Sequence, residues 1–144
     1  GYKEYMSSEM SPEIAEWIEK RGLGELADTM GIKILALDGT HGVATMPAEG
    51  NTQPLGIVHG GAYVVLAETL GSMCATIAAG PGRHAVGIEI NASHTKSARE
   101  GIIRATAKAV SIGRNLATHE VAVEDDQGNR LSTVRITNFL RDNR

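Results

Sequence analysis

The residue best placed to do chemistry is Glu68, the only charged side chain between Gly60 and Ala79. A lone carboxylate among small and apolar residues is costly to bury unless it is paired or has a task. Burial would strengthen its affinity for protons, which suits a general base; a nucleophile and a purely structural, hydrogen-bonded carboxylate are the alternatives. Ser72 lies one helical turn further on the same face, where its hydroxyl could orient Glu68 or a water, or bond back to the carbonyl of residue 68.

His59, Gly60 and Gly61 open the same stretch. A helix that starts here presents free amides at the positive end of its dipole, an arrangement that attracts an oxyanion, and the glycines let a substrate carbonyl approach the backbone. Gln53, in the loop just before, could donate to the same oxygen or hold a water. Both features also have plain structural interpretations, as a packed glycine-rich helix start and a solvated loop amide.

The spacing of these groups predicts a dimer. Gly60 and Glu68 are eight residues apart, so they lie about 12 Å apart along one helix axis. A reacting carbon must lie within about 3 Å of each group that acts on it, so one helix cannot supply both. If both act on one carbonyl, they come from two chains whose helices lie side by side and antiparallel, with the sites at the interface.

The sequence offers little support for catalysis by a metal, a nucleophilic serine or a thiol. The five histidines lack the spacing of metal ligands, and neither a Gly-x-Ser-x-Gly elbow nor a phosphate-binding Gly-x-x-x-x-Gly-Lys loop occurs, so no metal is predicted. The single cysteine, Cys74, is interpreted as a core residue. Four cations could bind phosphates or could be ordinary surface charge: Arg83, Lys96, Arg99 and Arg114.

Composition narrows the class of protein further. At 144 residues the chain is long enough for one domain with a real core, predicted over 1–144. A net charge of −3 and 3% aromatic residues argue against nucleic acid as a partner and against a membrane-surface role. One cysteine and no apolar leader predict a reducing, cytoplasmic location.

The stretch from Gly60 to Ala79 predicts a long helix that ends at Gly80-Pro81-Gly82, because glycine suits a helix cap and proline cannot continue a helix. Its apolar positions cover nearly the whole circumference, so we expect a central helix buried on all sides. Its length would suffice to span a bilayer, but Glu68 and three glycines make a transmembrane span a poor interpretation.

The rest of the sequence predicts two short helices and a set of strands. Ser11-Pro12-Glu13 is typical of a helix start, and Asp38-Gly39 between apolar runs is typical of a hairpin. The expected elements are a loose tail over 1–10, helices over 11–20 and 23–29 that end at Gly22 and Gly31, a hairpin of 32–37 and 40–46, a loop over 47–60, and strands over 84–97, 99–112, 116–124 and 130–140.

The strand expected over 99–112 alternates sharply, with Ala105, Ala107 and Ala109 on one face and polar side chains on the other. A face of alanines lets the buried helix come close. No crossover helix separates the late strands, so the sheet should be antiparallel. The sequence therefore predicts an α+β fold, with an N-terminal tail and helices over 1–30 and a sheet curled round one helix over 31–140.

Three segments resemble a known family: VHGGAYVVLAETLGSMCA, VGIEINASHTKSAREG and SIGRNLATHEVAV. They are similar to the hotdog-fold acyl-CoA thioesterases, and most of all to the 4-hydroxybenzoyl-CoA thioesterase of the Arthrobacter type, with the menaquinone-pathway thioesterase as a near relative. The resemblance covers about residues 30–140 and implies the hotdog fold, in which a curved antiparallel sheet wraps one long helix. It also implies a dimer with shared active sites, and a dimer of dimers.

The resemblance assigns roles to individual residues. It implies that Glu68 is the catalytic carboxylate, that the Gly60 amide polarises the thioester oxygen, that Gln53 and His59 bind the thioester or the water, and that Ser72 sits beside Glu68. It implies that the path of coenzyme A is lined by Gly87, His94, Thr95, Lys96, Ser97, Ser111, Ile112, Gly113, Arg114, Asn115 and Leu116. Two residues depart from the family pattern: Ser72 where threonine is expected, and Lys96 where relatives often carry arginine.

The expected function is hydrolysis of an aromatic acyl-CoA, with 4-hydroxybenzoyl-CoA of 4-chlorobenzoate degradation as the first choice. No cofactor is expected, because coenzyme A is part of the substrate. The alternatives are thioesterases of the 1,4-dihydroxy-2-naphthoyl-CoA or phenylacetyl-CoA type and a hotdog dehydratase or hydratase. The last alternative is a protein that binds and senses acyl-CoA without hydrolysing it.

Overall fold

Local signals set the ends of the helices. The computed structural model describes residues 10–144. Helix α4 runs Gly60–Ala79, with His59 as N-cap and Gly80 as C-cap. Helix α2 (Pro12–Arg21) starts at Ser11, whose hydroxyl accepts from the Ile14 amide at 3.2 Å, as predicted. Helix α3 (Glu25–Met30) begins two residues later than predicted, because Gly24 has φ +93° and lies outside the helical region.

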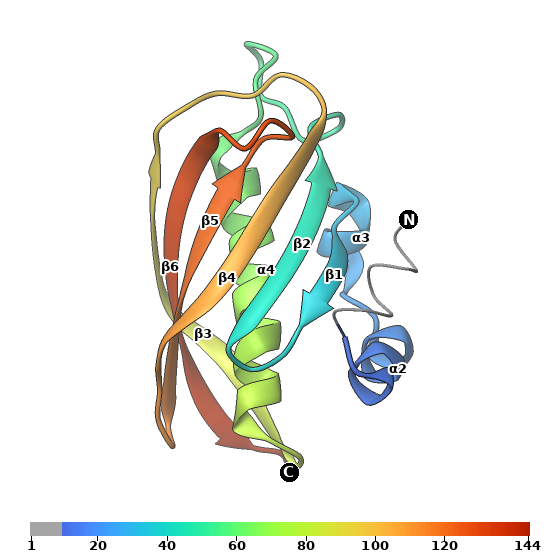
Figure 1. Cartoon of the computed structure of the whole chain (residues 1–144), viewed down its shortest axis with the longest axis vertical. Helices are drawn as coiled ribbons and strands as arrows, with labels where there is room; N and C mark the ends of the chain where they lie inside the picture. The colour runs from blue at the N-terminus through green and yellow to red at the C-terminus, as the bar shows by residue number, and fades with distance from the viewer. Residues whose placement is uncertain (1–9) are drawn as a thin grey trace.

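The strands form one antiparallel sheet that curls around α4, which confirms the predicted α+β hotdog architecture (Figure 1). The order in the sheet is β1-β2-β4-β5-β6-β3. The strands run β1 Lys33–Leu37, β2 His41–Pro47, β3 Arg83–His94, β4 Ile102–Ile112, β5 Leu116–Glu124 and β6 Arg130–Asp142. The predicted tail over 1–10 lies outside the described residues except for Met10, which is buried.

The sheet-facing side of α4 forms the core. Leu66, Leu70 and Cys74 are fully buried there, and the predicted alanine face of β4 lies on the inner side of the sheet. The helix comes so close that a Cβ atom on Gly71 would lie 2.5 Å from Ile136 Cγ2. Burial raises the pKa of Cys74 to about 12, so its thiol stays protonated and the prediction of a core residue is confirmed.

The opposite side of α4 corrects the prediction of a helix buried all round. Glu68 is exposed within this chain, and Val64, Val65 and Ser72 are only partly buried. The sheet covers one face only, and α2 and α3 cover just part of the other. By length and composition α4 could cross a membrane, but half of the qualifying stretch is buried inside this fold, as a core helix requires.

Strand β3 is an edge of the sheet and has no strand on its outer side among the described residues. Its twelve residues include a bulge between Gly87 and Glu89. The side chains of Val86 and Ile88 are 40% and 57% exposed. A long edge strand presents unpaired backbone donors and acceptors, which is a template for pairing with another chain.

Candidate active site

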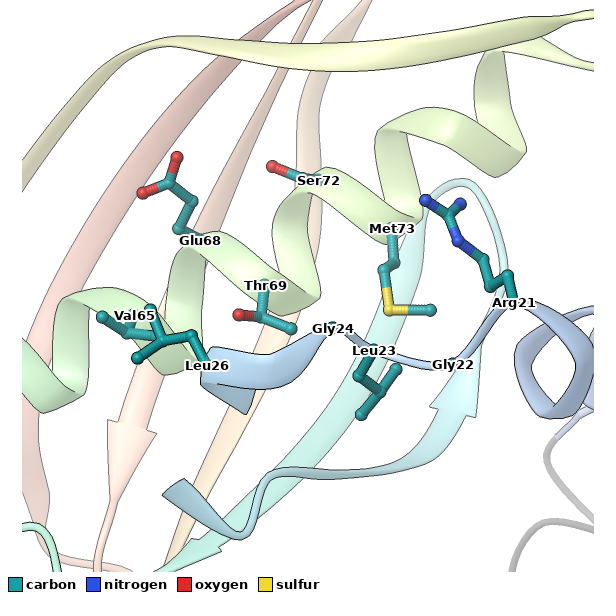
Figure 2. Close-up of a pocket in the computed structure, with 10 residues that line it drawn as sticks. All are labelled: Arg21, Gly22, Leu23, Gly24, Leu26, Val65, Glu68, Thr69, Ser72 and Met73. Carbon is teal, nitrogen blue, oxygen red and sulfur yellow. The ribbon is translucent and has the colours of Figure 1, made fainter. Parts of the chain in front are cut away.

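Glu68 lies in a cavity of about 430 Å³ between α4 and the N-terminal helices. Figure 2 shows its carboxylate on the same side of α4 as the Ser72 hydroxyl, one turn away. The cavity is lined by Arg21, Gly22, Leu23, Gly24, Leu26, Val65, Glu68, Thr69, Ser72 and Met73. The prediction that Glu68 is buried is therefore wrong for the isolated chain: its carboxylate faces an open cavity and not the core.

Gly87 of β3 makes room for the Glu68 carboxylate. A Cβ atom at position 87 would lie 2.8 Å from Oε2 of Glu68, closer than side chains tolerate. The backbone of Gly87 is not in the left-handed region, so its lack of a side chain serves this close approach and not a turn. The adjacent bulge re-aims the strand at this point, as bulges beside active sites commonly do.

The Ser72 hydroxyl donates a hydrogen bond to the side chain of Asn138. Its Oγ donates to Oδ1 of Asn138 on β6 at 3.0 Å, and not to Glu68 or to the carbonyl of residue 68. Asn138 is fully buried, and its Nδ2 has no hydrogen-bond partner among the described residues. Because the hydroxyl proton is engaged, the free lone pair of Ser72 can only accept a hydrogen bond. A water between Ser72 and Glu68 would therefore donate to both.

The Gly60 end of the helix forms a second cavity, of about 360 Å³. It is lined by Gln53, Ile57, Val58, Gly60, Tyr63, His94, Thr95, Lys96 and Ser97. The Gly61 amide donates to Nδ1 of His59 at 2.8 Å, whereas the Gly60 amide has no partner among the described residues. One free amide at the positive end of a helix dipole therefore opens into this cavity, where it could hold an oxyanion.

Gln53 and His59 each use one polar atom in a hydrogen bond, and the other polar atom has no partner among residues 10–144. Oε1 of Gln53 accepts from the Leu55 amide, which leaves the side-chain NH₂ group as a donor. Nδ1 of His59 accepts from Gly61, so a neutral ring carries its proton on Nε2. Both residues therefore offer hydrogen-bond donors near the start of α4.

His94 is also oriented by its neighbours. Its Nδ1 lies 2.8 Å from Oγ of Ser132, which donates its own proton to the Ser93 carbonyl at 3.2 Å. Nδ1 of His94 is therefore the donor, and a neutral ring keeps its lone pair on Nε2. A Cβ atom on Gly60 would lie 2.8 Å from that nitrogen, so His94 packs directly against the start of α4.

The two cavities share no residue, so one chain does not bring Glu68 and Ser72 together with Gln53 and Gly60. Gly87 and the segment His94–Ser97 are likewise divided between the two neighbourhoods. The turn 111–116 lies further away, since Leu116 pairs with Phe139 and Phe139 with Val86, eight residues along β3 from His94. Eight strand residues span about 26 Å. The predicted coenzyme A residues thus lie at opposite ends of β3.

Several arginines lie together near the turn 111–116. Arg83, Arg114 and Arg141 line a common cavity with Asn115. Arg83 is committed to the fold, because it donates to the Arg114 carbonyl at 3.0 Å and pairs with Asp142 at 3.0 Å. Arg99 is likewise structural and donates to the Leu55 carbonyl at 3.1 Å. Arg114 and Arg141 remain as cations for a phosphate.

Sequence reasoning missed Arg21, Asn138 and Arg141. Asn138 carried a usable signal, since it shares the inward phase of β6 with Ile136 and Leu140, where a polar residue is unexpected. Arg21 and Arg141 carried none, because their relation to the cavities depends on contacts between distant segments.

Comparisons with known proteins show which family the chain resembles. The profile of the Thioesterase superfamily matches residues 55–132. The chain is 37% identical to the proofreading thioesterase EntH of Cronobacter turicensis over 85% of this chain and 90% of that protein. It is 34% identical to the 1,4-dihydroxy-2-naphthoyl-CoA hydrolase of Escherichia coli over 87% and 93% of the two chains. A crystal structure of a mutant thioesterase PA1618 from Pseudomonas aeruginosa superposes with a TM-score of 0.82 at 32% identity, covering 88% and 93%.

Proposed function

The chain belongs to the thioesterase superfamily, and on that premise we propose that it hydrolyses an aromatic acyl-CoA whose ring carries a hydroxyl group. The fold is the hotdog fold and the enzyme class is thioester hydrolase. The observation that carries the proposal is the Glu68 carboxylate in a cavity of about 430 Å³ with both apolar and polar lining residues, a size suited to a small acyl group. The substrate we put first is 4-hydroxybenzoyl-CoA, as the resemblance to the Arthrobacter type implies.

A second acyl group has its own support. The Escherichia coli relative is named a 1,4-dihydroxy-2-naphthoyl-CoA hydrolase, and it matches over most of both chains. A naphthoyl group has two fused rings, so it would fill more of the cavity than a benzoyl group. The two substrates share a hydroxyl-bearing aromatic ring next to the thioester.

In the proposed reaction, Glu68 removes a proton from water while the water oxygen bonds to the thioester carbon. The carbonyl electrons move to oxygen, where the Gly60 amide stabilises the negative charge. The intermediate collapses with loss of the coenzyme A thiolate, which recovers the proton from Glu68. Alternatively, Glu68 itself attacks and expels the thiolate, and water then hydrolyses the mixed anhydride. Both routes use only water, the Glu68 side chain and the backbone amide of Gly60, so we propose no cofactor.

We propose that the working unit is a dimer with two shared sites. The unpaired edge of β3, the open face of α4 and the separation of the two cavities support this arrangement. A two-fold axis beside β3 would bring Glu68 of one chain to Gly60 of the other. An apolar patch on the outer face of the sheet, formed by Val86, Leu116 and Phe139 in neighbouring strands, supports further association into a dimer of dimers.

We further propose that the enzyme acts in the cytoplasm and that Arg114 and Lys96 contact the phosphates of coenzyme A. The cluster of Arg114 and Arg141 beside a common cavity supports the first of these contacts. Lys96 lines the cavity at Gly60, so it would contact a different phosphate from the one that Arg114 contacts.

The test is release of free thiol across a panel of aromatic and aliphatic acyl-CoAs, with Glu68→Gln as the decisive variant. We expect hydroxyaryl-CoAs to be the best substrates. Glu68→Gln should lose about 10²- to 10⁴-fold in kcat while still binding substrate, because general-base catalysis contributes that much. Near-native turnover by Glu68→Gln would overturn the role of Glu68. Binding without turnover by the unaltered protein would indicate an acyl-CoA sensor, and formation or loss of an enoyl thioester would indicate a hydratase.

A further inference from the structure

A single guanidinium stands at the end of the Glu68 cavity that is remote from the carboxylate. Arg21 is the last residue of α2 and lines the cavity together with Glu68. Figure 2 shows Glu68 and Arg21 at opposite ends of a row of side chains, with Ser72 and Met73 between them. Among the described residues no carboxylate pairs with Arg21. The cavity therefore has a reacting carboxylate at one end and an uncompensated donor group at the other.

The guanidinium is held in place by its neighbours. It lies over the Trp17 ring at 4.5 Å from the centroid, a cation–π contact that limits the positions it can adopt. The two glycines that follow α2 have φ of +68° and +93°, so the chain turns sharply here and Leu23 comes to line the cavity. Arg21 is thus an exposed residue of the cavity rim whose guanidinium is restrained by one aromatic contact.

The distance between the two ends suits one substituted ring. Met73, which neighbours Arg21 along the cavity, lies five residues beyond Glu68 and hence about 7.5 Å further along the axis of α4. That length accommodates an aromatic ring with one substituent opposite the thioester. Between the two ends the cavity is lined by Thr69, Met73 and Leu23, whereas Val65 and Leu26 lie on the side of Glu68 away from Arg21 (Figure 2).

We propose that Arg21 is a specificity-determining residue that donates hydrogen bonds to an oxygen substituent on the far side of the acyl group, a phenol, phenolate or carboxylate. This inference rests on the proposed function, since it concerns the acyl group of the same reaction. An acyl group with such an oxygen accepts a charge-assisted hydrogen bond from the guanidinium, whereas an unsubstituted ring leaves the guanidinium to water. Because Arg21 is exposed and water competes for its donors, we expect discrimination of about tenfold.

The experiment compares kcat/KM for 4-hydroxybenzoyl-CoA and benzoyl-CoA, two substrates that differ only in the oxygen. The unaltered enzyme should prefer the hydroxylated substrate. Arg21→Met should reduce the ratio by about tenfold, and Arg21→Lys should keep part of it, because a point charge replaces a fork. Trp17→Leu, which keeps the Arg21 side chain but removes the ring that restrains it, should give an intermediate ratio. Lys20→Met is the matched control: Lys20 pairs with Glu16 at 2.9 Å outside the cavity, so the ratio should not change.

The outcomes separate this inference from the proposed function. An unchanged ratio in an active Arg21→Met enzyme, or no preference in the unaltered enzyme, would overturn the role of Arg21 and leave the thioesterase proposal standing. Failure of the unaltered enzyme to hydrolyse any aromatic acyl-CoA would overturn the proposed substrate class, and the role of Arg21 with it. If Arg21→Met does not fold, Arg21→Lys and Trp17→Leu decide in the same way.

Discussion

Replacing Gly87 with alanine should disable Glu68 without harming the fold. The new Cβ atom would lie 2.8 Å from Oε2 of Glu68, about 0.6 Å short of ordinary contact, while its other neighbours, Ile136 and Asn138, lie at 3.6 and 3.8 Å. The carboxylate is the end of a flexible, exposed side chain, so it moves and the strand does not. A misplacement of about 1 Å costs about 10²-fold in rate, so we expect kcat to fall by about 10- to 100-fold.

Stability should change little in the same variant. Gly87 does not need a left-handed backbone, and alanine restricts the unfolded chain more than glycine does, so the free energy of unfolding should stay within about 1 kcal/mol. The assay pairs kcat from thiol release with thermal unfolding. A large loss of stability would show that Gly87 serves the strand and not the carboxylate.

A double-mutant cycle makes this prediction sharper. Glu68→Asp withdraws the carboxylate by one bond, about 1.5 Å, and so removes the collision. Glu68→Asp alone should be slow, but adding Gly87→Ala to it should cost less than about threefold, because the two changes are coupled. Independent, multiplying losses in the double variant would refute the argument that the Cβ atom acts by displacing Glu68.

Three further predictions concern residues around the reacting group and the coenzyme A phosphates. Ser72→Ala should lower kcat by about tenfold, less than Glu68→Gln, because it removes an orienting hydroxyl and not the reacting group; a larger loss than for Glu68→Gln would reverse the two roles. Asn138→Leu should lower kcat to a similar extent while leaving the melting temperature unchanged or higher, because it removes a buried amide whose Nδ2 is unpaired, and the double variant with Ser72→Ala should be no slower than either single one. Arg114→Ala should raise KM more than it lowers kcat, with a smaller effect at high salt; a loss in kcat alone would count against a phosphate contact.

The fold was predictable because its signals are local. Ser11 caps a helix, Gly80 ends one and Asp38-Gly39 turns a hairpin through interactions within a few residues, so each could be recognised without knowing the rest of the chain. The alternation of alanines in β4 also identified the face on which the helix packs. These features together predict an antiparallel sheet packed on one helix.

The surroundings of Glu68 were not predictable in the same way. Val64 and Val65 made α4 look apolar on every side, yet they lie on the face that the sheet leaves uncovered. Whether such a face is open depends on how far the sheet curls, which no local pattern states. The partnership of Ser72 with Asn138 joins residues 66 positions apart, and the position of Arg21 beside the cavity depends on how α2 packs, so both required the structure.

The shared site is the central claim, and mixed dimers test it most directly. One chain carries Glu68→Gln and the other Gly60→Pro, which deletes the amide and would also displace His94. Neither homodimer should turn over. In the heterodimer one site collects both lesions and the other collects none, so about half of the native activity per dimer should return. If heterodimers form and the mixture stays inactive, Glu68 and Gly60 do not act across an interface and the account fails.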